Sequence, residues 1–554
     1  MAFASTLKRI ELPNSNGINE DLRPVESTRR TWTWITFHNF WLLINCNIAT
    51  FLTGSALIPL GLTWWQAIIA IVIGNVIATA ALLVSSLAGA YYNIGFGVFS
   101  RVTWGIWGSQ FAIWNRIFLA FVWLSRYGFQ SWVGGECLYL ILLSFDPRYG
   151  ERIPNTIAEE TGMTSAQFVS YVLFCVISLP VLWINPHRLE KFFYFASCFT
   201  IVFFVALLIW ALATMGPDGF GSTLDSHSQL PITGGPYSTV WLMIYGIMST
   251  VGSIAAGIMN QNDYARLARQ PSDAILGQAF PFPVYSIFAS VVGILVTAAT
   301  QNRFNGEAIW NPPTLFVRLL EKDQSGGTRA AVFFAGLALI ISQMGSNLPG
   351  NALAGGIDLA AVFPKYINIR RGAYAVAIIS PAVNPWRLVS SATTFLLVLS
   401  GYGVFLAPMT GLMASSYLLV NKRKLKTNDL YNFSSSGIYW YTSGCNWRAP
   451  VSWLVGVVPC LPGFVAAIDT SVKVSDAAIE LYYLNYLFGF LTSGLVYYLL
   501  HIIFPARLVD TFVRSAGNPA EVQRLSREQW DVLPAQDTES VDARENIVDL
   551  LKQA

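Results

Sequence analysis

The feature that constrains this chain most is a series of twelve apolar segments separated by polar connections. A helix needs about 20 mostly apolar residues to cross the hydrocarbon of a bilayer, and every segment except the short ninth is near that length. Only 12% of the 554 residues are charged, about half the fraction of soluble domains. The sequence therefore predicts an all-α polytopic membrane protein. The segments cover residues 40–62, 66–90, 117–145, 168–184, 192–215, 240–259, 279–300, 330–354, 373–383, 388–419, 451–468 and 481–504.

Polar tails flank the apolar region. We expect residues 1–34 to form an N-terminal tail, 35–504 the transmembrane domain and 505–554 a C-terminal tail. The first tail has no apolar core, which argues against a cleaved signal peptide. Lys and Arg gather in alternate connections, whereas residues 216–238 contain none. The positive-inside rule then predicts that both tails lie in the cytoplasm, where they are candidates for contact with the trafficking machinery.

Three polar side chains lie inside the third apolar segment: Arg126, Gln130 and Glu136. Polar and ionisable groups at membrane depth are costly, so they usually face protein or a water-filled cavity and mark pathways or binding sites. Arg126 and Gln130 are four residues apart, which places them on one face of a helix, about one turn from each other. That face is a candidate wall of a binding site.

Two segments look interrupted by small and polar residues. Residues 49–62 read ATFLTGSALIPLGL in the first segment, and residues 246–257 read GIMSTVGSIAAG in the sixth. Glycine-interrupted helices at corresponding places in two halves indicate a transporter site, because the half-helix ends offer free backbone groups to substrate and ion. Close helix packing through small residues is the alternative interpretation.

Several longer motifs resemble those of nucleobase-cation-symporter family 1, in its fungal Fur-type branch. Residues 260–280 read NQNDYARLARQPSDAILGQAF, and residues 345–372 read GSNLPGNALAGGIDLAAVFPKYINIRRG. The shorter motifs TWWQA and LSGYGVFLAP, and the longer DLYNFSSSGIYWYTSGCNWRAP, also resemble the family. The resemblance extends over nearly the whole chain apart from the tails.

This resemblance implies a leucine-transporter-type architecture, in which two inverted repeats of five helices are followed by two further helices. It implies proton-coupled uptake of a ring compound such as uracil, uridine, allantoin or urate at the plasma membrane. A transporter of a thiamine- or nicotinamide-riboside-like vitamin and a transport-deficient sensor are the alternatives. The four histidines are scattered and no HExxH, P-loop or GxSxG motif is present, so no enzyme, metal site or cofactor is expected. No cluster of Lys and Arg lies beside aromatic residues in a solvated segment, so binding to nucleic acid is not expected.

The resemblance also implies a substrate site. The family's third helix carries a WxxxQ pair that stacks on the ring and hydrogen-bonds it. Here Gln130 matches the pair, while Arg126 replaces the tryptophan. Asn347 and Asn351 match an Asn-xxx-Asn pair in the eighth helix, although interhelical hydrogen bonds would also explain such amides. For Arg126 we consider an anionic substrate, an internal ion pair, or snorkelling toward the helix end.

The family's sodium-coupled members use two adjacent hydroxyls in the eighth helix. This chain has Gly345 and Ser346 at those positions, so one hydroxyl is absent. With a hard oxygen ligand missing, sodium coupling becomes less favourable and a proton gradient is expected to drive transport. Glu136 and Asp358 are the candidate proton carriers; a paired structural carboxylate and a helix-end hydrogen bond are the respective alternatives.

Further positions follow from the register with the family. Gly252 and Ser253 in the sixth segment match substrate-site positions, but neither offers a stacking aromatic ring. Phe395, Leu399 and Tyr402 in the tenth segment match an outer gate, and their spacing places them on one helix face. A packing stripe would have the same spacing.

Overall fold

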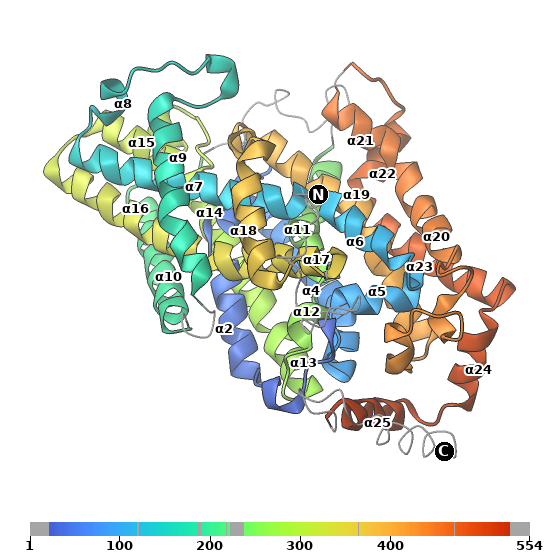
Figure 1. The fold of residues 1–554 in the computed structure, drawn as a ribbon. Coiled ribbons are helices and arrows are strands. Elements are labelled where there is room, and N and C mark those ends of the chain that lie inside the picture. Colours follow the sequence, from blue (N-terminus) through green and yellow to red (C-terminus); the bar gives the residue numbers. More distant parts are fainter. Residues whose placement is uncertain are drawn as a thin grey trace, which may run out of the picture.

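The computed structural model describes residues 22–118, 121–184, 190–217, 219–221, 238–363, 365–469 and 471–531, and within these ranges the side chains of 117–125, 190, 191, 193 and 349 lie outside the description. Within these ranges the chain folds into helices joined by turns, with two isolated β-bridges and no longer strand (Figure 1). The all-α prediction is therefore confirmed.

Nine helical stretches in the described residues are long and apolar enough to cross a membrane, and a bent helix pair adds a tenth. The bent pair is α2 (Trp34–Asn45) with α3 (Ile48–Ser55). The third and ninth predicted segments are occupied by α7 (Phe121–Phe145) and the 11-residue α18 (Ile369–Ile379), which is too short to span alone. The nine stretches contain α4 (Trp64–Tyr92), α9 (Ser165–Ser178), α10 (Glu190–Ala213), α11 (Thr239–Met259), α13 (Pro271–Ala279) with α14 (Pro281–Thr300), α16 (Gly326–Asn347) with α17 (Leu353–Val362), α19 (Ala392–Ser415), α20 (Arg448–Val457) with α21 (Leu461–Ile468), and α23 (Asn485–Ile503).

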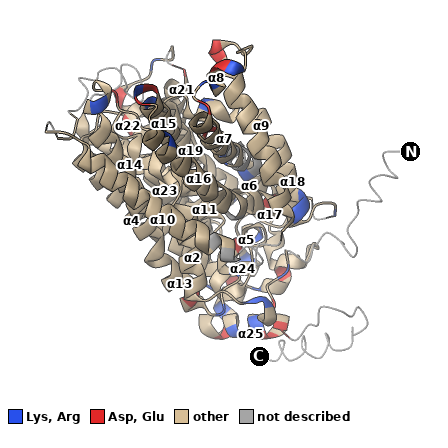
Figure 2. Ribbon diagram, turned by 90° about the vertical axis from the view of Figure 1, so that its left-hand side faces the viewer, with Lys and Arg blue, Asp and Glu red and all other residues tan. Residues whose placement is uncertain are grey.

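Short helices fill the connections and the ends of the bundle. Those around the spans are α5 (Phe96–Trp104), α6 (Ser109–Phe118), α8 (Tyr149–Arg152), α12 (Asn262–Ala265), α15 (Pro312–Lys322) and α22 (Asp476–Tyr483). Charged residues gather near the two ends of the bundle, around α8 at one and α25 (Pro519–Asp531) at the other, while the middle is largely uncharged (Figure 2). This distribution is the one expected of a chain whose centre lies in hydrocarbon.

The predicted helix interruptions are only partly where the sequence pattern suggested. In the first span the helix bends by 59° at Cys46 and Asn47, before residues 49–62, and it ends at Ser55 within them. The prediction for the sixth span is wrong, because α11 runs unbroken through residues 246–257 and ends at Met259. The glycines there serve packing, since a Cβ at Gly252 would lie 2.1 Å from the Leu399 carbonyl oxygen of α19.

The C-terminal segment closes one end of the bundle. It forms α24 (Arg507–Ser515) and α25, and α25 packs against α4. Arg527 donates to the carbonyl oxygen of Tyr91 at 2.9 Å. An ion pair of 2.8 Å joins Asp531 to Arg30. The segments that precede and follow the membrane domain in the sequence therefore meet at this end of the bundle.

Candidate functional site

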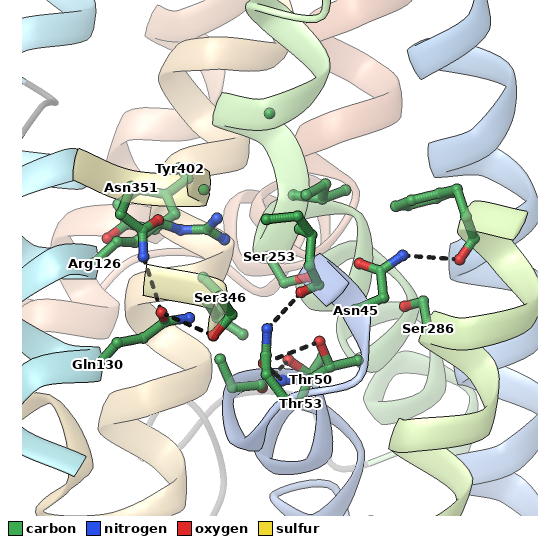
Figure 3. Close-up of a pocket in the computed structure, with 18 of the residues that line it drawn as sticks. Asn45, Thr50, Thr53, Arg126, Gln130, Ser253, Ser286, Ser346, Asn351 and Tyr402 are labelled. Atoms are coloured by element: carbon green, nitrogen blue, oxygen red, sulfur yellow. Dashed lines mark hydrogen bonds between the residues drawn. The ribbon is translucent and has the colours of Figure 1, made fainter. Parts of the chain in front are cut away.

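A cavity lies between the helices of the bundle and is lined from α2, α3, α7, α11, α14, α16 and α19 (Figure 3). It holds about 1150 Å³ of space, open solvent at its mouth included. Its polar lining is rich in amides and hydroxyls. Among the described residues that line it, only Arg126 carries a formal charge.

Two amides from different helices meet in the cavity wall. Gln130 Oε1 on α7 accepts a hydrogen bond from Asn351 Nδ2 at 3.1 Å. Ser346 Oγ lies 3.4 Å from the same oxygen. Asn351 belongs to a π-helical turn, Leu348–Ala352, that joins α16 to α17, and such turns often occur at functional sites. The packing of α7 against α16 and its π-helical turn thus brings Gln130 and Asn351 into one cluster, with each amide able to donate and accept.

Asn347, predicted beside Asn351 in the substrate site, lies behind the cavity wall rather than in its lining. Its Oδ1 accepts from Asn351 Nδ2 at 2.8 Å. Its Nδ2 donates to the Tyr127 carbonyl oxygen and to Ser131 Oγ, at 3.2 and 3.1 Å. Because both ends of this amide are used by protein, Asn347 orients Asn351 and holds α16 against α7.

The Arg126 side chain lines the cavity, where Figure 3 shows it beside Asn351 and Tyr402. Among the described residues, no carboxylate oxygen lies within 4.0 Å of a guanidinium nitrogen of Arg126, the limit for an ion pair. The internal ion pair considered for Arg126 thus has no partner in these ranges, and a side chain in the cavity wall is not snorkelling to the helix end.

The three predicted gate residues all line the cavity from α19. The Phe395 ring packs against Phe129 of α7 at a centroid distance of 5.8 Å and against Trp310 at 5.6 Å. Leu399 lines the cavity from the same helix, and Tyr402 lies beside Arg126 (Figure 3). The contact between Phe129 and Phe395 joins α7 and α19 at the cavity wall, and the gate role of the three residues stays a prediction.

Neither predicted proton carrier lines the cavity. Asp358 Oδ1 on α17 lies 2.7 Å from Arg116 Nη2 on α6, with side chains 2% and 0% exposed. Glu136 Oε2 accepts a hydrogen bond from Asn311 Nδ2 at 3.3 Å, just before α15. Within the described ranges, no Lys or Arg pairs with Glu136. Asp358 therefore has a fixed counter-ion, whereas Glu136 is a half-buried carboxyl held by an amide.

Comparison with known proteins identifies the family to which this chain belongs. Residues 24–489 match the family model described as a permease for cytosine/purines, uracil, thiamine and allantoin. The chain belongs to this permease family. It is 34% identical to Transporter aclS of Aspergillus oryzae, covering 88% of this chain and 86% of the relative. It is also 34% identical to the uridine permease of Saccharomyces cerevisiae, covering 92% and 78%.

The fold is also that of a solved transporter. The inward-facing conformation of Mhp1 superposes with a TM-score of 0.68 at 21% identity, covering 95% of this chain and 100% of that one. The predicted leucine-transporter-type fold and the family resemblance are both confirmed. The chain is a multi-pass membrane transporter, and its relatives are permeases rather than enzymes.

Sequence reasoning missed polar residues of the permease cavity that gather at the bend between α2 and α3. Asn47 caps α3 by accepting from the Thr50 backbone N–H at 3.0 Å. Asn47, Thr50 and Thr53 all line the cavity. The signal was present, because an Asn three residues before a Thr at the start of an apolar run is typical of an N-cap. The sequence pattern instead placed the interruption further along the chain, around Gly54 and Pro59.

Ser253 lines the permease cavity opposite Arg126, whereas Gly252 does not line it. Ser253 Oγ donates to the Thr250 carbonyl oxygen at 2.7 Å within α11. Gly252 instead lets α11 approach the Leu399 carbonyl oxygen of α19. The structure thus supports a site position for Ser253 and a packing role for Gly252.

We expect Gly252→Ala to lower the amount of folded permease at the membrane while leaving the KM of the remaining uptake unchanged. The added methyl would clash with backbone 2.1 Å away, and overpacking of this kind costs about 1–3 kcal/mol. Gly246→Ala on the same helix is the control, because its methyl meets the flexible Leu57 side chain at 3.2 Å. Fluorescence of a tagged protein and uptake kinetics measure both effects. A raised KM at full delivery would place Gly252 against the solute.

Proposed function

We propose that this permease is a proton-coupled symporter that carries a nucleobase-related ring solute into the cell by alternating access. The observation that carries the proposal is the amide pair Gln130–Asn351 in the cavity wall, 3.1 Å apart. The class of solute follows from the family, described by cytosine, purines, uracil, thiamine and allantoin, and from the relative named for uridine.

The shape and chemistry of the cavity support a flat heterocycle. Two amides can read adjacent N–H and C=O groups on a ring edge, because each amide both donates and accepts. Phe129 and Phe395 line the same cavity and offer apolar ring faces. Aromatic faces pack well against planar rings, which adds affinity beyond the area buried. Gln130 and Asn351 are thus proposed as the residues that orient the solute.

The eighth helix supports protons rather than sodium as the coupling ion. A side chain added at Gly345 would meet the Leu43 and Ala196 side chains at 3.1 and 3.2 Å, so this position faces apolar groups. Ser346 Oγ donates to the Ser342 carbonyl oxygen at 3.0 Å. Sodium prefers several hard oxygen ligands, and a single engaged hydroxyl is a poor start for such a site.

Glu136 is the carboxyl proposed to carry the proton. It has an amide donor in Asn311 but no cation pairs with it in the described part of the chain. A carboxylate without a counter-ion at membrane depth is costly, so protonation there relieves an unfavourable charge. Asp358 is less suited, because Arg116 stabilises its ionised form. The Lys- and Arg-rich alternate connections support a cytoplasmic position for both termini, and the similarity to fungal permeases supports a place in the plasma membrane.

Uptake of radiolabelled uracil, uridine, allantoin and urate by cells lacking their own transporters tests the function. We expect saturable uptake of at least one solute that rises from pH 8 to pH 5, collapses with an uncoupler and ignores replacement of sodium. A lower outside pH raises the inward proton gradient, which fixes the sign. A strict sodium requirement would overturn the proton assignment, and binding without accumulation would favour a sensor.

The variant Glu136→Gln tests the proposed carrier in the same cells. The amide keeps an oxygen that can accept from Asn311 but cannot bind and release a proton. We expect concentrative uptake to be lost and the pH dependence to disappear, while exchange of labelled solute across preloaded membranes persists. Loss of exchange as well would mean that Glu136 is needed for folding or binding. Unchanged accumulation would remove it from coupling.

A further inference from the structure

The charge of the cavity wall narrows the class of solute beyond a neutral nucleobase. Arg126 is the only formally charged residue among the described residues that line the cavity. Amides, hydroxyls and apolar side chains make up the rest of that lining. A solute that enters this cavity therefore meets a positive charge and, in the described wall, no negative one.

Other buried arginines of the bundle are held by protein groups. Arg116 pairs with Asp358 at 2.7 Å. Arg101 donates to the Leu430 carbonyl oxygen at 2.8 Å, and Arg448 donates to that of Phe504 at the same distance. Arg126 differs, because in the described part of the chain its guanidinium has neither an ion pair nor a hydrogen bond to a protein group, and it faces the cavity.

An arginine in such a place is costly unless a ligand compensates it. Ionisable residues at the centre of a membrane helix carry a large desolvation cost, so they mark functional sites by default. The Tyr402 phenol lies beside the guanidinium (Figure 3) but supplies no full negative charge at neutral pH. The missing counter-charge is therefore one that the solute itself can bring.

From these observations we propose that the permease selects an anionic oxo-heterocycle, a ring that carries a carboxylate or an ionised oxo group beside an NH–C=O edge. This assignment rests on the proposed uptake function and names its substrate class. The planar guanidinium matches a carboxylate or a delocalised oxyanion with two parallel hydrogen bonds. Gln130 and Asn351 read the neighbouring NH–C=O edge.

The spacing on α7 fits one small ring. Arg126 and Gln130 are four residues apart, which corresponds to about 6 Å along a helix. A six-membered ring with a carboxylate substituent covers a similar length, so its anionic group can meet Arg126 while its amide-like edge meets Gln130. A cationic solute such as thiamine would place its charge in a cavity whose described wall holds only positive charge.

Orotate and uracil are a matched pair of probes, because they share a pyrimidine ring and differ by one carboxylate. We expect wild-type permease to prefer orotate over uracil at least 10-fold in the ratio of maximal uptake rate to KM. Arg126→Gln should lower that ratio for orotate about 10- to 100-fold, the loss expected for a charge-assisted bidentate contact. Uracil uptake should change less than threefold. Urate and hypoxanthine provide a second anionic and neutral pair.

Two further variants sharpen the test. Arg126→Lys should keep part of the preference, since it retains charge but loses the planar fork. Arg126→Trp restores the aromatic residue expected from the family and should shift preference toward the neutral probes. Arg269→Gln removes an exposed arginine and serves as the control for loss of charge alone. Equal loss for orotate and uracil in Arg126→Gln, or wild-type preference for the neutral probes, would overturn the assignment.

Thermal unfolding of the purified protein separates this assignment from the uptake function. If orotate stabilises the wild type and not Arg126→Gln, the anion contact is supported even where cells accumulate neither probe. In that case the transport function fails and the assignment stands. If uracil is accumulated but orotate neither stabilises nor competes, transport stands and the anion assignment is wrong.

Discussion

Replacing Asn351 by alanine is expected to abolish saturable uptake while the protein still reaches the plasma membrane. The variant removes the amide that donates to Gln130 Oε1 and faces the cavity from the π-helical turn. A buried polar group that loses its partner costs about 1–3 kcal/mol, and the solute loses its own contacts in addition. Uptake of the preferred radiolabelled probe, normalised to tagged protein at the cell surface, measures the effect.

Asn347→Ala is the informative companion to this variant. Asn347 touches Asn351 from behind but does not line the cavity, so it acts by orientation. We expect a raised KM with much of the maximal rate retained, because the binding amide is still present but less well placed. Gln130→Ala should match Asn351→Ala, since the two side chains form one pair. Uptake like the wild type in Asn351→Ala would remove this residue from the solute site.

Part of this site could be predicted from the sequence, because Arg126 and Gln130 lie close together on one helix. The four-residue spacing of Arg126 and Gln130 fixes a shared helix face. Asn351 joins them only through the packing of α16 against α7, which the family motif supplied and composition could not. The gate face of α19 followed from the same helical spacing, although a packing stripe would have produced an identical pattern.

The predicted helix interruptions were misplaced because glycine in a membrane helix serves two different purposes, close helix packing and a break in the helix. In α11, Gly252 lets two helices approach, and nothing in the local sequence separates that use from a break in the helix. The real break of the first span lies at Cys46 and Asn47, where a side chain rather than a glycine ends one helix and caps the next. Sequence alone also cannot pair Arg116 with Asp358, because they come from distant helices.

The buried ion pair between Arg116 and Asp358 joins α6 to α17, two helices that lie next in the chain to the elements carrying the site. Arg116 lies on α6, which precedes α7, and Asp358 lies on α17, which follows the turn of Asn351. The Arg116 guanidinium also lies 4.3 Å from the centroid of the Phe96 ring. Breaking such a pair by removing one partner costs about 3–5 kcal/mol, because the other charge stays buried. Arg116→Ala and Asp358→Ala are therefore expected to lose most folded protein.

The double variant Arg116→Met/Asp358→Leu separates stability from the transport cycle. Replacing a buried ion pair by packed apolar side chains is often neutral or stabilising, so we expect the thermal stability and surface delivery lost in the single variants to return. We expect uptake to stay low if the transport cycle separates α6 from α17, because water can solvate the two charges of a separated ion pair, whereas an apolar contact resists separation. Recovery of uptake together with stability would show that the pair only holds the fold.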